Sequence, residues 1–132
     1  MRLAAAVAAL AALLPAATLP AAAAPDPARG EQIYGRCLAC HDLARDRVGP
    51  RHCGLFGRRA GSVPGFVYSP AMKSSGIVWN AATLDRFLAA PMKAMPGTAM
   101  TYDGIPDPTE RADLIAWLEQ AGRSAECRAV AR

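Results

Sequence analysis

The chain has 132 residues, a formal net charge of +4 and 52% hydrophobic residues, which corresponds to about one domain. Much of the apolar content lies in the first 24 residues, and the remainder has the composition of an ordinary globular domain, which argues against a membrane protein and a disordered chain. The net charge, about +3 without Arg2, is too small for a nucleic-acid-binding protein, which needs a concentrated basic stripe.

The N-terminus has the layout of a secretory signal peptide. Arg2 supplies a positive charge, a run of twelve apolar residues extends from Leu3 to Leu14, and small residues occupy positions 21–24. The run is shorter than the roughly 20 residues that a membrane span needs. We therefore expect a signal peptide at residues 1–23 cleaved near Ala23, a periplasmic domain at residues 24–132, and no stable membrane insertion. An uncleaved anchor helix is the alternative, because the apolar stretch could continue past Pro15.

The first half of the mature chain predicts two short helices separated by a long loop. Asp26 and Pro27 form a typical helix start, and this helix is expected to run towards Cys37. Residues 42–68 contain five glycines and two prolines and show no helical or alternating periodicity. Such a long loop in a compact domain is usually functional. Residues 69–76 predict a helix capped by Ser69 and ended by glycine.

The second half predicts two further helices. Asn80 can cap a helix that Pro91 ends, and residues 91–106 are expected to form a second irregular loop. Asp107 starts the last helix, with Glu110 expected to complete a capping box. Its apolar stripe consists of Leu114, Ile115, Trp117, Leu118 and Ala121, and a polar tail follows at residues 123–132. Strand patterns are absent, so the predicted fold class is all-α.

Cys37-Leu38-Ala39-Cys40-His41 matches the C-x-x-C-H pattern of covalent haem attachment. Two thiols at this spacing can each form a thioether with one vinyl group on the same porphyrin edge, and the adjacent histidine can bind the iron. A zinc site would need a second pair of ligands at suitable spacing, and a redox dithiol would need a βαβ context. The pattern therefore predicts one covalent haem c with its iron, which would also give the long loops a core to surround.

The iron needs a second axial ligand unless its site is open. The candidates are His52, Met72, Met92, Met95 and Met100, and spacing alone does not choose among the three methionines of the second loop. A thioether sulfur would favour ferrous iron, whereas apolar packing is the ordinary role of methionine.

Several stretches resemble class I cytochromes c, from Gly30 to Ala121. The stretches that carry the resemblance are Gly30 and Tyr34, the C-x-x-C-H motif, Val48-Gly49-Pro50, Gly54-Leu55-Phe56-Gly57-Arg58, Pro64-Gly65-Phe66-Val67-Tyr68, Gly76-Ile77-Val78-Trp79, Pro96-Gly97-Thr98-Ala99-Met100 and Arg111-Ala112-Asp113-Leu114-Ile115-Ala116-Trp117-Leu118. The resemblance implies the cytochrome c fold, with about four or five short helices and long loops wrapped around one haem.

The same resemblance implies roles for individual residues. His41 and Met100 would be the axial ligands, and the carbonyl of Pro50 would accept a hydrogen bond from His41. Gly30 and Tyr34 would lie where the first and last helices cross. The residues expected to hydrogen-bond the haem propionates are Arg58, Tyr68 and Trp79.

Two departures from the family stand out. His52 occupies a position where the family usually has leucine; it lies on the side already held by His41, so a bis-histidine site is disfavoured, and we expect its side chain to reach solvent or a backbone carbonyl. The family's docking lysines are largely replaced, by Met92, Ala99, Pro106 and Asp107, and only Lys93 and Arg36 keep their charge. The resemblance therefore does not identify a partner.

Cys53 and Cys127 remain after the haem cysteines are assigned, which leaves an even number in an exported protein. In the family the last helix crosses near the haem-motif helix, so its tail could reach the loop after Pro50. We expect a disulfide between Cys53 and Cys127; the alternative is one buried thiol and one exposed thiol.

The predicted function is that of a soluble periplasmic one-electron carrier, not an enzyme. We expect a monomer that docks transiently to redox proteins at the exposed haem edge. The alternatives are an electron-accepting subunit bound tightly to one dehydrogenase, and a peroxidase or gas-binding cytochrome with an open iron site.

Overall fold

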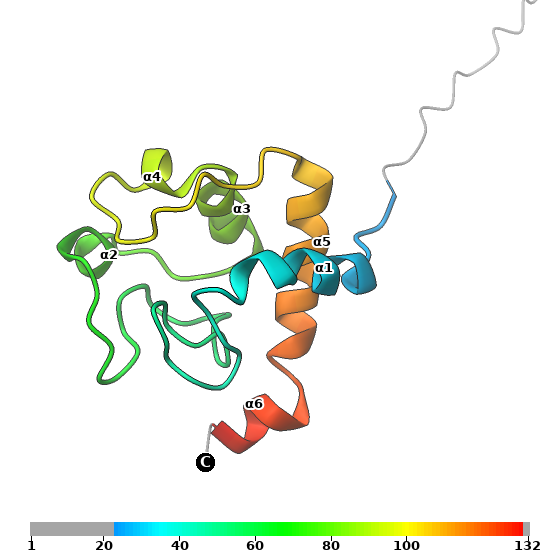
Figure 1. Ribbon diagram of the computed structural model, residues 1–132, viewed down its shortest axis with the longest axis horizontal. Coiled ribbons are helices and arrows are strands. Elements are labelled where there is room, and N and C mark those ends of the chain that lie inside the picture. Colours follow the sequence, from blue (N-terminus) through cyan, green and yellow to red (C-terminus); the bar gives the residue numbers. More distant parts are fainter. Residues whose placement is uncertain (1–22, 131–132) are drawn as a thin grey trace, which may run out of the picture.

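The computed structural model describes residues 23–130, which form short helices joined by long loops (Figure 1). The predicted signal peptide, apart from Ala23, and the last two residues lie outside this range. The elements are α1 (Pro27–Tyr34), the 3-10 helix η1 (Gly35–Cys37), α2 (Pro70–Ser74), α3 (Ala81–Ala89), α4 (Pro91–Ala94), α5 (Pro108–Ala121) and α6 (Ala125–Val130). Strand pairing in the described residues is limited to one isolated bridge between Arg59 and Val78. The all-α prediction is confirmed.

The predicted helix starts are present because short polar side chains accept bonds from the first free backbone N–H groups. The Asp26 carboxylate accepts from the N–H of Ala28 at 2.9 Å, and the Asp107 carboxylate accepts from the N–H of Thr109 at 2.7 Å. Ser69 caps α2. At α3, Asn80 and Thr83 cap reciprocally, with each side chain accepting from the other residue's backbone N–H.

Helices α1 and α5 cross in direct contact, with Gly30 at the crossing (Figure 1). A Cβ at Gly30 would overlap the carbonyl group of Asp113 and would lie 2.8 Å from the Cβ of Trp117. One turn later, the rings of Tyr34 and Trp117 pack with centroids 4.2 Å apart. The prediction that Gly30 and Tyr34 lie where the first and last helices cross is confirmed.

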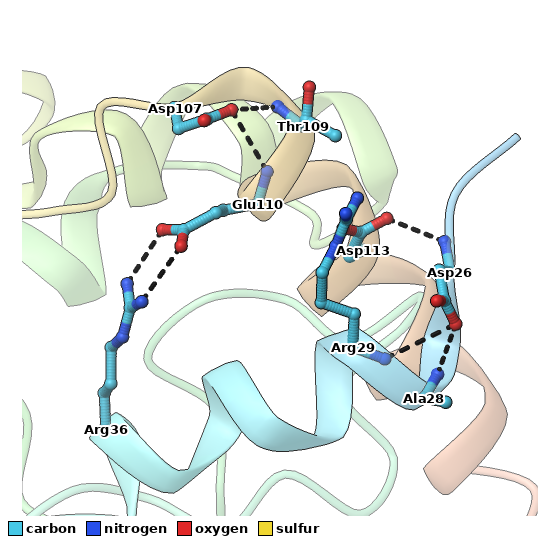
Figure 2. Close-up of polar contacts among 8 residues, drawn as sticks. All are labelled: Asp26, Ala28, Arg29, Arg36, Asp107, Thr109, Glu110 and Asp113. Atoms are coloured by element: carbon cyan, nitrogen blue, oxygen red, sulfur yellow. Dashed lines mark hydrogen bonds and ion pairs between the residues drawn. The ribbon is translucent and has the colours of Figure 1, made fainter. Parts of the chain in front are cut away.

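A buried carboxylate fastens the start of α1 to α5. The side chain of Asp113 is fully buried, accepts the backbone N–H of Asp26 at 2.7 Å and pairs with the Arg29 guanidinium (Figure 2). The hydrogen bond from Arg29 and that from Asp26 lower the pKa of Asp113. The role of Asp113 is not predictable from sequence, because a polar residue within a helical stripe gives no sign of a partner more than 80 positions away.

Glu110 does not complete the expected capping box. Its carboxylate accepts two bonds from the guanidinium of Arg36, at 2.8 and 2.9 Å (Figure 2). A bidentate charge-assisted pair offers Glu110 more than a single bond to the backbone of Asp107 would. The prediction failed because η1 brings Arg36 to the start of α5, which local sequence does not reveal.

The second loop, which was expected to be irregular, and the polar tail each contain a short helix. Pro91 ends α3 as predicted, but it also starts the single-turn α4, since proline suits the first position of a helix. In the tail, Ala125–Val130 form α6, whose Cys127 is buried and bonded to Cys53 with the two Cα atoms 4.9 Å apart. The disulfide thus ties α6 to the loop that follows Pro50. Among residues 23–130, no helix combines the length and apolarity needed to cross a bilayer.

Candidate cofactor-binding site

A cavity of about 390 Å³ lies among the end of α1, the cysteine motif, the long loops, α3 and α5. Its size falls within the usual range for sites that enclose a small molecule, about 300–1,000 Å³. Apolar side chains form much of its wall, including Leu55, Leu84, Phe87, Leu88, Leu114 and Leu118. The residues predicted to hold haem or its iron all line this cavity: Cys37, Cys40, His41, Pro50, Arg58, Tyr68, Trp79 and Met100.

The position of His41 is set by the turn that contains the two cysteines. The N–H groups of Cys40 and His41 both donate to the carbonyl of Cys37, at 3.1 and 2.9 Å. The ring Nδ1 of His41 lies 2.8 Å from the carbonyl oxygen of Pro50. Because a carbonyl only accepts, Nδ1 carries the proton and Nε2 keeps its lone pair for a metal. Burial lowers the pKa of His41, which favours this neutral form.

Gly49 provides the space for the His41 ring. A Cβ at Gly49 would lie 2.6 Å from both ring nitrogens of His41. The N–H of Gly49 also donates to the carbonyl of Cys40 at 2.8 Å, which holds the two segments together. Gly49 was part of the family resemblance, but sequence alone does not reveal this steric role.

Cys37 and Cys40 stand at the cavity wall beside His41, and neither belongs to the disulfide. Cys37 is half-buried, and burial raises the pKa of its thiol to about 11, whereas Cys40 is exposed. Cys37, Cys40 and His41 together therefore present two sulfurs and one imidazole to the same cavity, which suits thioether attachment of a haem. Although these three side chains line one cavity, no three His, Cys, Asp or Glu side chains within residues 23–130 are arranged to hold one metal ion, as the zinc alternative requires.

The structure separates the candidate methionine ligands by their surroundings. Met95 is buried in the hydrophobic core and Met92 is 44% exposed, and neither lines the cavity. Met72 and Met100 both line it and are partly buried. Within the second loop, only Met100 thus presents its side chain to the cavity that His41 lines.

The half-buried guanidinium of Arg58 points into the same region. It donates to the carbonyls of Cys53 and Arg51, at 3.1 and 2.9 Å, but it forms no ion pair with a carboxylate of the described residues. Burial lowers the pKa of Arg58, so an anionic group beside it would offset an energetic cost. A propionate fits this requirement. Tyr68, whose hydroxyl accepts weakly from the N–H of Val63 at 3.4 Å, and buried Trp79 lie on the same cavity.

The side chain of His52 is partly buried, and the hydrogen-bond partner of its Nδ1 is another side chain rather than the expected backbone carbonyl. Its ring stacks on His41, with centroids 4.3 Å apart and planes inclined by 23°. Its Nδ1 lies 3.0 Å from the hydroxyl of Tyr34, which offers a buried partner. Burial and the neighbouring His41 and Arg58 lower the pKa of His52 well below its usual value. Two rings this close cannot sit on opposite faces of a porphyrin, which argues against a bis-histidine site.

Comparisons with known proteins agree with this site. A family model described as Cytochrome c matches residues 27–122. Cytochrome c2 of Rhodomicrobium vannielii is 47% identical over 96 residues, which cover 70% of this chain and 77% of that protein. Cytochrome c of Chlamydomonas reinhardtii is 45% identical over 100 residues, covering 73% and 89% respectively. The solved structure of cytochrome cH from Methylobacterium extorquens is 42% identical, with a TM-score of 0.70 and coverage of 72% of this chain and 98% of that one. The chain therefore belongs to the cytochrome c family, and it is an electron-transfer protein with one covalently bound haem c rather than an enzyme.

Proposed function

We propose that the protein is a periplasmic one-electron carrier in which Cys37 and Cys40 hold the haem through thioethers while His41 and Met100 ligate its iron. The observation that carries this proposal is the cavity that all four side chains line. When bound, the haem supplies an iron that alternates between the ferric and ferrous states.

The surrounding residues prepare the ligands. The carbonyl of Pro50 accepts a hydrogen bond from Nδ1–H of His41, which leaves Nε2 unprotonated and would make the ring a better donor to iron. Gly49 leaves the ring the space it occupies. The thioether sulfur of Met100 would favour ferrous iron relative to an imidazole in the same position. An iron held by both His41 and Met100 would suit a carrier, because it would leave no position for a substrate.

The propionates would lie near Arg58, Tyr68 and Trp79. A propionate beside Arg58 would supply the negative charge that this guanidinium lacks among the described carboxylates. The cavity side of Tyr68 and Trp79 offers a hydroxyl and an indole N–H as further donors.

We propose that redox partners dock transiently at the haem edge, through the loop around Lys93 to Met100. Met92 and Ala99 are exposed there and make the contact partly apolar. Arg36, one of two cations kept from the family's docking edge, is paired with Glu110 and so contributes little net charge. The net charge of about +3 after export would steer partners only modestly.

Mass spectrometry and extraction test the covalent link. Acid–organic extraction is expected to leave one haem on each chain. Cys40→Ala should retain at most one thioether and lower the yield of holoprotein. His41→Ala should lower that yield further, because it removes an iron ligand rather than a tether. Release of the haem from the wild-type protein would contradict thioether attachment.

Optical spectroscopy tests the ligand set. The ferric protein is expected to show the weak far-red band from methionine sulfur to iron, and Met100→Ala should abolish it and lower the reduction potential. Met95→Ala and Met92→Ala are the matched controls within the same loop, and Met72→Ala tests the other methionine at the cavity. Loss of the band in any of these three, with its retention in Met100→Ala, would refute the assignment.

Two further measurements separate the alternative functions. Rapid binding of carbon monoxide to the ferrous protein at neutral pH would indicate an open iron site. A persistent complex with a dehydrogenase on gel filtration of native extract would indicate a dedicated subunit rather than a mobile carrier.

A steep fall in electron-transfer rate between low and physiological ionic strength would contradict the docking surface proposed above.

A further inference from the structure

Buried Tyr34 and partly buried His52 form a polar pair that the electron-carrier function does not by itself require. The hydroxyl of Tyr34 and Nδ1 of His52 are 3.0 Å apart, and Tyr34 is only 4% exposed. Both side chains line the haem cavity. The pair therefore lies between the crossing of α1 with α5, where Tyr34 packs on Trp117, and the ring of His41, on which His52 stacks.

The backbone that carries His52 is itself tied to the segment that follows His41. The N–H of His52 donates to the carbonyls of Asp42 and Leu43 at 3.2 and 3.1 Å. The N–H of the next residue, Cys53, donates to the carbonyl of Leu43 at 2.7 Å, a backbone bond in which the disulfide takes no part. The position of the His52 Cα is thus defined before its side chain makes any contact.

The hydrogen bond of His41 to Pro50 does not fix the tilt of its imidazole ring, and His52 is placed to restrict that tilt. The bond from Nδ1 to the Pro50 carbonyl fixes one point of the ring, and a ring fixed at one point can still tilt. A flat neighbour stacked at 4.3 Å restricts that tilt. The Tyr34 hydroxyl in turn fixes the rotation of the His52 ring, because the hydrogen bond is directional.

We propose that Tyr34 and His52 act as positioning residues that set the plane of the His41 imidazole and link it to the α1–α5 crossing. The proposal rests on His41 being an axial ligand. His52 itself does not bind the iron. It acts through the face of its ring, and Tyr34 acts through His52.

The experiment measures the proton NMR shifts of the haem methyl groups in the ferric holoprotein, because their pattern depends on the orientation of the axial ligand planes. Three variants are compared with wild type: Tyr34→Phe, His52→Leu and the double variant. Both single variants are expected to change the methyl pattern, and His52→Leu should change it more. The double variant should match His52→Leu, since Tyr34 acts only through His52.

The matched control is the double variant Cys53→Ala with Cys127→Ala, which loosens the same region but leaves Tyr34 and His52 intact. It is expected to melt at a lower temperature and to keep the wild-type methyl pattern. A methyl pattern that stays unchanged in Tyr34→Phe and His52→Leu, whatever their melting temperatures, would overturn the proposal. So would a control variant whose pattern changes as much as that of His52→Leu, because general loosening would then explain the result.

The optical spectrum distinguishes failure of this proposal from failure of the function on which it rests. A wild-type protein without histidine and methionine ligation would contradict the proposed function. Intact ligation in every variant, together with an unchanged methyl pattern, would contradict only the positioning role.

Discussion

Replacement of both Cys53 and Cys127 by alanine is expected to lower the free energy of unfolding by about 4 kcal/mol, on the chain-entropy account of cross-links. The two cysteines are separated by 74 positions, so their bond excludes many conformations of a long loop from the unfolded chain. For a domain of this size, that loss corresponds to a fall in melting temperature of roughly 15 °C. The loss of packing contacts in the folded state should contribute less than this loop entropy, because Cys127 is the only buried residue of α6.

Thermal and urea unfolding of the holoprotein, followed by far-ultraviolet circular dichroism, measure this effect. Wild type with reductant in the unfolding buffer should approach the double variant. The urea m-value should rise in the double variant, because its unfolded chain exposes more surface without the cross-link. The visible haem spectrum is expected to stay unchanged, since neither cysteine lines the haem cavity.

Alkylation of the denatured, unreduced protein checks the premise. Two alkylatable thiols would show that the bond does not form in the native protein. If mass spectrometry finds the bond but the double variant loses less than about 1 kcal/mol, the loop-entropy reasoning would be refuted, because the relation predicts several times that loss.

Three other predictions concern the close contacts of the fold. Gly30→Ala should destabilise the protein by about 1–3 kcal/mol or more in urea unfolding, because its Cβ would overlap the carbonyl of Asp113 and force the helices apart. Gly49→Ala should shift the reduction potential and lower the yield of holoprotein, measured by voltammetry and haem content, since a methyl group there would displace the ring of His41. Asp113→Asn should lower the free energy of unfolding at neutral pH but not in acid. The pKa of Asp113 is lowered in the folded state, so its carboxylate stabilises the fold above the usual carboxyl pKa, and this stabilisation is lost as pH falls through the lowered value.

Matched variants sharpen these tests. Gly35 lies just after α1, where a Cβ would meet no atom within 4 Å, so Gly35→Ala should change the free energy of unfolding little. A Gly30→Ala protein as stable as Gly35→Ala would show that the helices have room to separate. For Asp113→Asn, unfolding free energies that differ from wild type equally at every pH would show that the charge of this carboxylate contributes nothing.

Features that depend on neighbours in the chain were predictable from sequence. The caps at Asp26, Ser69, Asn80 and Asp107 involve groups two or three positions apart, so a short window contains both partners. The haem motif is likewise local, because its two thiols and its imidazole occupy five consecutive residues. The class of fold followed from these elements and from the family resemblance.

Features that depend on distant partners were not predictable in this way. Glu110 was expected to complete a capping box with Asp107, but its carboxylate instead binds the guanidinium of Arg36, which lies 74 positions away in sequence. His52 was expected to reach solvent or a carbonyl because nothing in its own segment shows that the hydroxyl of Tyr34 lies beside it. Asp113 gave no signal at all, although it is fully buried in the contact between α1 and α5.

The same distinction applies to the site. The sequence by itself determined which atoms could attach a haem and which could bind iron, since those choices follow from the chemistry of thiols, imidazole and thioether sulfur. It left the methionines of the second loop equivalent. Only the tertiary structure separated them, by burying Met95 in the core, exposing Met92 and turning Met100 towards the cavity. The physical reason is that residue type fixes which chemical group a side chain carries, whereas its burial and its neighbours are set by the packing of the whole chain.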